Sequence, residues 1–229
     1  MLTKRNRLCT ITFNKQSLAL SLFSFKDSNV FLHAHETFPL HKREIVGARI
    51  FNPTTIIAVL KKFAYNHNLK NTPVSSAIRG DYISEKQVAT HNASPEKKEL
   101  IAAAKHTLSE ACYLHPTQDG TFSFYTCSIE QPLLLQYKLL ALQSNLNLVS
   151  LTTHTIALLH AYKQMHKDTF RHSQLGLHLA QKNNNFENII NAEMVWRLLQ
   201  SAPRATLPEH IDPPILLTHC GLAFMHASL

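Results

Sequence analysis

The first residues that could do chemistry stand at a turn near the N-terminus, where a hairpin could hold a phosphate group. Apolar and polar residues alternate along CTITFNKQSLALSLF, residues 9–23, which predicts two strands joined by a turn over residues 14–17. Phosphate-binding turns use glycine for close backbone approach and an acid to hold the metal ion. This turn offers Asn14, Lys15, Gln16 and Ser17. A phosphate site here would therefore lack its usual groups.

Glycine is scarce along the whole chain, and this bears on the other ways of binding a nucleotide. The sequence has five glycines, Gly47, Gly80, Gly120, Gly176 and Gly221. They form neither GxGxxG nor GxxxxGK[ST], so the common dinucleotide and P-loop motifs are excluded. We expect no nucleotide cofactor.

Histidine is abundant, with fifteen in the chain, and a metal site must be considered. His33 and His35 stand two apart and would share one face of a strand, whereas Glu36 would point to the opposite face. No HExxH motif occurs, and we expect surface or hydrogen-bonded histidines and no metal site. Three further histidines lie six residues apart and would spread around a helix: His154, His160 and His166.

Two residue pairs invite a catalytic interpretation, and neither has the right geometry. His219 and Cys220 are neighbours, but neighbours on a helix point about 100° apart, which prevents a nucleophile–base contact. Asp81 and Glu85 have helical spacing, but their flanks are typical of a loop. No GxSxG motif occurs. We expect no catalytic residue and a protein that is not an enzyme.

The elements that would position these residues begin with a three-strand antiparallel meander, completed by a strand over residues 30–38. Asn52 is a good N-cap, and Pro53 fits the first position of a helix that ends before Asn71. Residues 73–78 predict a strand. Ser94 and Pro95 predict the start of a helix over 95–113 with these residues on one face: Leu100, Ile101, Ala104, Leu108, Ala111 and Cys112.

The second half continues the alternation of strands and helices. We expect strands over 121–129, 146–151 and 174–181. Helices are expected from Pro132, from Thr152 or Thr153 to about Lys167, and over 193–200, followed by a proline-rich linker over 203–214. The helix from Pro132 carries Leu135, Leu139, Leu142 and Leu146 in one stripe, and an apolar helix from about 214 closes the chain.

Composition describes a folded, basic chain of 229 residues with 45% hydrophobic residues and a net charge of +8. The charge permits contact with nucleic acid or an anionic membrane surface. The basic residues are scattered, and only Lys4, Arg5 and Arg7 approach a cluster. Four cysteines without a CxxC pair indicate buried, reduced thiols: Cys9, Cys112, Cys127 and Cys220. With no signal peptide and no apolar run of about 18 residues, we expect a cytoplasmic protein.

The order of elements resembles half of an actin-like or ribonuclease-H-like domain, an α/β fold of mixed sheets flanked by helices. Three segments resemble the PilM family of type IV pilus assembly proteins: residues 47–63, residues 128–163, and the tail THCGLAFMHA with its Gly221, Leu222 and Ala223. The chain is most similar to the short, divergent HofM/ComA-like competence branch. On this basis we expect an N-terminal actin-like half over 1–120 and a C-terminal α/β half over 121–229.

The resemblance implies a cytoplasmic scaffold, peripheral to the inner membrane, for type IV pili or DNA uptake. Its partner would be the N-terminal tail of a PilN-like bitopic protein, added as a strand if the meander has an open edge. The phosphate hairpin would be degenerate at Thr12, Asn14 and Ser17, which makes the chain a pseudo-ATPase without a cofactor or small-molecule substrate. The partner-binding residues are unknown at this point. Two alternatives stay open: a nucleic-acid-binding protein on a ribonuclease-H-like body, and a weak ATPase.

Overall fold

The computed structural model describes residues 7–14, 16–26, 29–70, 72–92, 107–116, 119–165, 195, 198, 200–206 and 212–227. Its first three strands are β1 (Arg7–Phe13), β2 (Ser17–Lys26) and β3 (Asn29–Pro39). They form an antiparallel meander in which Cys9 pairs with Leu22 and Leu22 pairs with Ala34. The predicted meander is therefore confirmed, because period-two alternation gives each strand a buried face.

A six-stranded mixed sheet grows from this meander, in the order β10-β6-β1-β2-β3-β11. On one side, β6 (Pro73–Ile78) runs parallel to β1, and β10 (Asn147–Thr153) runs parallel to β6. On the other side, β11 (Gln200–Thr206) runs parallel to β3. The sheet thus takes strands from both sides of residue 120, and the division of the chain at that residue stays a prediction.

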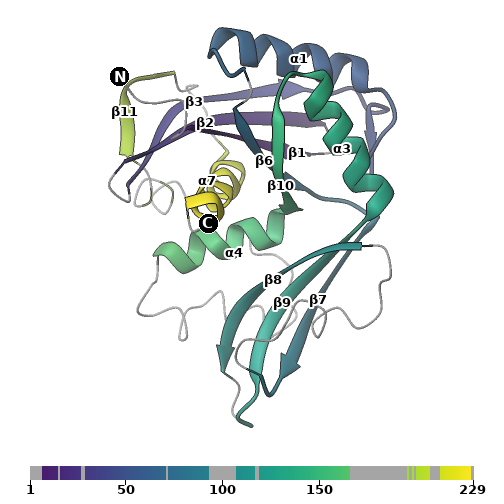
Figure 1. Ribbon diagram of the computed structural model, residues 1–229, viewed down its shortest axis with the longest axis vertical. Coiled ribbons are helices and arrows are strands. Elements are labelled where there is room, and N and C mark those ends of the chain that lie inside the picture. The colour runs from purple at the N-terminus through teal and green to yellow at the C-terminus, as the bar shows by residue number, and fades with distance from the viewer. Residues whose placement is uncertain are drawn as a thin grey trace.

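Helices cover both faces of this sheet (Figure 1). On one face, α1 (Pro53–Asn66) and α3 (Gln131–Gln143) bury Ile56, Leu60 and Tyr137 in a common core with the meander. On the other face lie α4 (His154–Met165) and α7 (Pro213–Ala227). Three of these helices begin where the sequence predicted a cap or a proline, and the closing helix is also confirmed.

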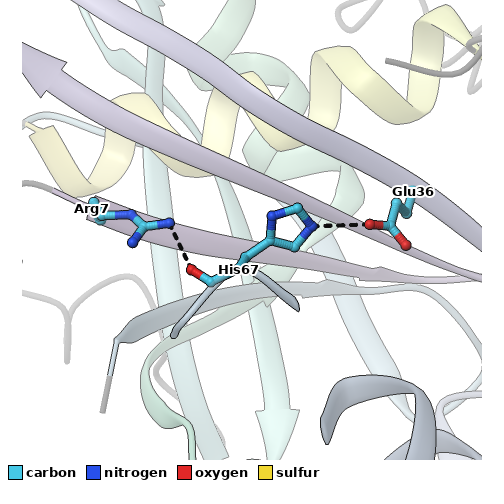
Figure 2. A network of polar contacts seen from close by, with 3 residues as sticks. All are labelled: Arg7, Glu36 and His67. Atoms are coloured by element: carbon cyan, nitrogen blue, oxygen red, sulfur yellow. Dashed lines mark hydrogen bonds and ion pairs between the residues drawn. The ribbon is translucent and has the colours of Figure 1, made fainter. Parts of the chain in front are cut away.

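The ends of α1 show why this helix was predictable. The Asn52 side-chain oxygen accepts a hydrogen bond from the Thr54 amide at 3.3 Å, which caps the N-terminus. At the C-terminal end, Arg7 donates to the carbonyl oxygen of His67, and the His67 ring is hydrogen-bonded to Glu36, both at 3.0 Å (Figure 2). These two contacts attach the end of α1 to β1 and β3.

The packing of α4 against α7, on the other face of the sheet, requires a glycine at position 221. Gly221 of α7 faces α4 so closely that a Cβ atom there would overlap the carbonyl group of Ala157. The two helices pack side by side against the sheet (Figure 1). Thr153 caps α4 by accepting a hydrogen bond from the Ile156 amide at 3.3 Å, as expected for one of the two predicted capping threonines.

A second sheet has three antiparallel strands in the order β7-β9-β8. These are β7 (Ile83–Thr90), β8 (Thr107–Pro116) and β9 (Phe122–Glu130). A two-stranded hairpin, β4 (Ile45–Val46) with β5 (Arg49–Ile50), precedes α1. Only β9 of these five strands was predicted, and the rest of the second sheet is new.

Three predictions of local structure need correction. The helix predicted over 95–113 is wrong from residue 107 onward, because β8 pairs with β9 along its whole length. The linker predicted from Pro203 begins inside β11, which pairs with β3 alone among the described strands, so the missing N–H of Pro203 can face away from the ladder. The segment around Glu85, interpreted as a loop, is strand β7. Residues 95–106 and the strand predicted over 174–181 lie outside the described residues.

The stripe of leucines predicted on α3 does not form the buried side of that helix. Leu135, Leu139 and Leu142 face solvent, while Leu146 lies beyond the end of the helix and is buried. The buried side of α3 is formed by Leu133, Leu134, Tyr137, Leu140 and Ala141. None of the described helices is long and apolar enough to cross a bilayer.

Candidate peptide-binding groove

A groove of about 480 Å³ lies between the two sheets. Its walls come from β10, β8, α3, α4 and the last turn of α7. The apolar part includes Leu134, Leu148, Ile156 and Met225. The size and the mixed lining suit a short segment of another chain or a small molecule.

Strand edges, rather than strand faces, form two walls of this groove. The four consecutive residues 148–151 of β10 line it, as do the consecutive Glu110 and Ala111 of β8. Successive side chains of a strand alternate between its faces, so consecutive residues share a cavity when the edge of the strand borders it. Within the described residues, β10 pairs only with β6, and β8 pairs only with β9. Among the described residues, the edge of β10 therefore offers backbone groups to a ligand.

A β-bulge marks the edge of β10 at the groove. The pairing of β10 with β6 shifts between Leu148 and Ser150, which leaves Val149 out of register and exposed. Bulges at sheet edges stop uncontrolled pairing and redirect side chains. Here the bulge turns Val149 and its neighbours toward the groove.

Polar groups in the groove are available for hydrogen bonds. The hydroxyl oxygen of Ser150 and Nδ1 of His226 are buried, and neither has a partner within the described part of the chain. Buried polar atoms are nearly always hydrogen-bonded, so an open one next to a cavity points to a ligand or water. Burial, followed by the charge of Lys163, lowers the pKa of His160 to about 4, so this ring is neutral at pH 7. Glu110 and Lys138 add one charge of each sign.

The predicted phosphate hairpin lies elsewhere, at the ends of β1 and β2. The Asn14 amide donates to the Ser17 carbonyl oxygen at 2.9 Å, and their side chains are 3.4 Å apart. Asn14 borders a separate cavity of about 630 Å³ whose other polar residues are Arg79, Asp81, His154, Asp212 and Thr218. Asn14 and Ser17 therefore bond to each other, and only Asn14 reaches the cavity.

Thr12, the third residue of the predicted hairpin site, is buried in the core. It is completely buried on the face of the sheet under α7, and its hydroxyl is 3.1 Å from Nε2 of His219. Thr10 approaches the other ring nitrogen of His219 at 2.6 Å. Both nitrogens of the His219 ring are thus used in holding α7 against β1.

The histidines considered for a metal site are hydrogen-bonded within the core. His35 is 2.7 Å from the Ser21 hydroxyl, and His33 is 2.6 Å from the Ser24 hydroxyl. The predicted shared face is wrong, because Ser21 pairs with Thr10 on the α7 side of the sheet and Ser24 pairs with Arg7 on the α1 side. A β-bulge between β2 and β3 at His33 interrupts the alternation. The described residues contain no group of three potential metal ligands. His166, the third member of the six-residue series, lies outside them.

The two pairs considered for catalysis are separated in the structure. Burial raises the pKa of Cys220, and the neighbouring His219 ring is occupied by Thr10 and Thr12. Glu85 accepts from the hydroxyl of Thr155 at 3.2 Å, whereas Asp81 borders the cavity next to Asn14. All four cysteines are buried and none forms a disulfide, which agrees with the prediction of buried thiols.

The groove could not be predicted from the sequence, because its walls come from elements far apart in the chain and depend on β8, whose segment was interpreted as a helix. The polar residues that line it, Ser75, Glu110 and Ser150, stand in strands that hold other polar residues, so they give no distinct signal.

No protein-family model and no curated protein matches the sequence. Among solved structures, a chain of the PilM–PilN type IV pilus biogenesis complex matches with a TM-score of 0.57 and 12% identity, over 70% of this chain and 52% of that chain. EpsL is an inner-membrane component of the Vibrio cholerae type II secretion system. Its cytoplasmic domain matches with a TM-score of 0.39 and 8% identity, over 66% of this chain and 57% of that chain. A Bacteroides thetaiotaomicron protein with an actin-like ATPase fold matches with a TM-score of 0.37 and 8% identity, over 72% of this chain and 59% of that chain.

The match to the PilM–PilN chain supports the predicted fold class. The chain has a mixed α/β fold of the actin-like and ribonuclease-H-like kind, with a mixed sheet flanked by helices. It spans about half the length of the PilM–PilN chain that it matches. At such low identity the similarity extends to the fold and not to individual residues of the groove.

Proposed function

We propose that the protein is a non-enzymatic scaffold of an inner-membrane assembly platform, for type IV pili or DNA uptake, and that its groove binds the cytoplasmic tail of a PilN-like bitopic protein. The observation that carries this proposal is the groove beside β10, whose second edge has no strand partner among the described residues. An extended peptide can add to such an edge through its backbone and place alternate side chains in the groove.

The proposed edge differs from the one considered in the sequence, which was an edge of the meander if it proved open. In the structure β3 pairs with β11 and β1 pairs with β6. Among the described residues the second edge of β10 has no strand partner and borders a cavity, with Ser150 and His226 available as hydrogen-bond partners. The structural match to a PilM–PilN complex supports a tail of this kind as the ligand.

A scaffold without nucleotide chemistry is also consistent with the hairpin. Asn14 and Ser17 bond to each other, and Thr12 is engaged by His219. A Mg²⁺–phosphate site needs hard oxygen ligands and close backbone groups, and the turn supplies no acid. The protein would act in the cytoplasm at the surface of the inner membrane.

The test is calorimetric titration of the full chain with a synthetic peptide of the N-terminal tail of the neighbouring PilN-like protein. Val149→Asp and Ala111→Asp place a charge on either wall of the groove, and each should weaken binding about tenfold or more. Ala89→Asp is the matched control, because Ala89 is exposed on β7 at the far edge of the second sheet. This control should bind like the parent protein.

Mg·ATP and a short DNA duplex serve as parallel titrants, since a weak ATPase and a nucleic-acid-binding protein are the alternatives. Saturable peptide binding that the two groove variants lose and the control keeps supports the proposal. Heat from ATP or DNA with none from the peptide overturns it, as does equal peptide binding by all three variants.

A further inference from the structure

Large hydrophobic side chains gather on one outer surface of the molecule. The exposed ones among the described residues are Val46, Phe51, Tyr65, Tyr82, Leu135, Leu139, Leu142 and Val149. Six of them lie on the solvent side of α1, α3 and the β4–β5 hairpin, and we call this surface the outer face: Val46, Phe51, Tyr65, Leu135, Leu139 and Leu142. Tyr82 touches Arg49 of the hairpin, and Val149 belongs to the groove.

The leucines of α3 form the centre of the outer face. Leu135, Leu139 and Leu142 are 49%, 56% and 69% exposed, and they repeat at the spacing that puts side chains on one side of a helix. The opposite side of α3 is already packed in the core. About half of Leu135 and Leu139 and most of Leu142 are therefore in contact with solvent.

The parts of the outer face are held together by hydrogen bonds. Tyr137 of α3 donates to the Ala48 carbonyl oxygen at 2.8 Å, and the Ile50 amide donates to the Gln136 side chain at 3.3 Å. Both contacts join the β4–β5 hairpin to α3. Helices α1 and α3 also touch, and they bury their opposite sides in the same core, so their exposed sides point away from the sheet together.

Positive charge surrounds these apolar residues. Lys61 and Lys62 of α1 and Lys138 of α3 are exposed, and neither helix contains an acidic residue. Over residues 40–70 the chain has six lysines and arginines and one acid, Glu44, which is buried. The exposed Glu130 at the start of α3 is within 3.7 Å of Arg49. The outer face is thus both apolar and basic.

From this combination we propose that the outer face binds an anionic lipid bilayer, with Leu135, Leu139 and Leu142 in the interfacial layer and Lys61, Lys62 and Lys138 against the lipid phosphates. Apolar side chains and lysines on the same helical surface are the features of interfacial membrane binding. The negative surface potential of the membrane attracts each lysine or arginine close to it. This inference goes beyond the peptide groove and is tested without the peptide.

Two other occupants fit the outer face less well. A second copy of the chain would bring Lys61, Lys62 and Lys138 against the same residues of its partner, and like charges repel across an interface. An acidic partner helix would need a groove to receive it. The cavity that reaches α3 is lined by Leu134 and Lys138, whereas the three leucines of the outer face do not line it.

The test is flotation of the full chain with vesicles of phosphatidylglycerol and phosphatidylethanolamine, compared with vesicles of phosphatidylcholine. We expect binding to the anionic vesicles only. Lys61→Gln with Lys62→Gln should lower the partition coefficient about 25-fold, because each lysine contributes roughly fivefold near an anionic surface. Leu139→Gln with Leu142→Gln should lower it at least about tenfold through lost apolar contact.

Lys86→Gln is the matched control, since Lys86 is exposed on β7 in the second sheet. Its variant removes a positive charge and should bind vesicles nearly as well as the parent. Equal losses for Lys86 and the α1 lysines would mean non-specific attraction by net charge and would overturn the proposal. Absence of vesicle binding, or a dimer in sedimentation that the leucine variants abolish, would overturn it as well. Retained peptide binding in these variants keeps this test separate from that of the groove.

Discussion

Acid should destabilise this protein through three histidines buried in their neutral form. His219 of α7 packs against His35 of β3 with the ring centroids 5.4 Å apart, and His154 begins α4. Burial lowers the pKa of His35 to about 4. Burial, followed by the charge of Arg79, lowers the pKa of His154 to about 4, and burial next to His35 and His154 holds the pKa of His219 well below its ordinary value.

The sign and size of the effect follow from proton linkage. Above the ordinary histidine pKa of about 6.5 both the folded and the unfolded chain hold these rings neutral, so their protonation does not change the stability. Between pH 6.5 and the lowered pKa values only the unfolded chain takes up protons, which favours unfolding. At pH 5, His35 and His154, whose pKa values fall to about 4, then cost about 2 kcal/mol each. Together they cost about 4 kcal/mol, a large part of the roughly 5–15 kcal/mol that typically stabilises a domain, and His219 acts in the same direction.

The assay is urea denaturation at a series of pH values from 8 to 5, with the unfolding free energy plotted against pH. His219→Gln should be less stable at pH 8, because the contacts with Thr10 and Thr12 are altered. Its loss of stability between pH 8 and 5 should nevertheless be smaller than that of the parent. His41→Gln is the matched control, since His41 is exposed, and its curve should run parallel to the parent's.

Two results would refute this reasoning. A parent whose stability is constant from pH 8 to 5 would show that the buried rings take up protons in the folded state without cost. A His219→Gln curve parallel to that of the parent would show that His219 does not contribute, whatever the cause of the acid sensitivity.

Three further substitutions test the packing. Gly221→Ala should lower the unfolding free energy by about 1–3 kcal/mol, because the added methyl overlaps the Ala157 carbonyl; unchanged urea denaturation would show that α4 and α7 can separate freely. Leu140→Ala should cost about 2–5 kcal/mol and Leu142→Ala less than about 0.5, and equal thermal shifts in the pair would disprove the assigned orientation of α3. Asn52→Ala should cost about 1 kcal/mol in urea denaturation, and a neutral effect would mean that the cap does not stabilise α1.

The parts of the fold that could be predicted are those whose signals are local. The meander was predicted from the alternation of apolar and polar residues. Helix α1 was predicted from Asn52 with Pro53 and from apolar residues at helical spacing. The closing helix was found from its apolar tail, and the resemblance to an actin-like layout then gave the correct fold class.

The second sheet shows where local signals fail. Leu108, Ala111 and Cys112 fit helical spacing, but Cys112 and Leu114 also alternate, and both are buried in a strand. Pairing with β9, which is distant in sequence, decides between the two. Strand β7 has almost no buried residue, so it carries no alternation to recognise.

The orientation of α3 could not be predicted for a different reason. Its sequence, QPLLLQYKLLALQ, is apolar nearly all round, so several stripes fit the core equally well. The choice of Tyr137 and Leu140 over Leu139 and Leu142 depends on the position of the β4–β5 hairpin, where the Tyr137 hydroxyl finds the Ala48 carbonyl. The two residues are 89 positions apart, so the contact cannot be predicted from local sequence.

Helix α3 joins the two proposed functions physically. Leu134 and Lys138 border the groove, while Leu135, one residue further, belongs to the outer face. Burying a leucine side chain is worth about 1.5–3 kcal/mol. The three exposed leucines of α3 would therefore add favourable free energy to any contact that removes them from water. Soluble domains rarely expose such a continuous patch without using it. A tail leaving the groove beside α3 would start at the edge of the outer face, which is where a membrane-anchored partner and the lipid surface would both have to be.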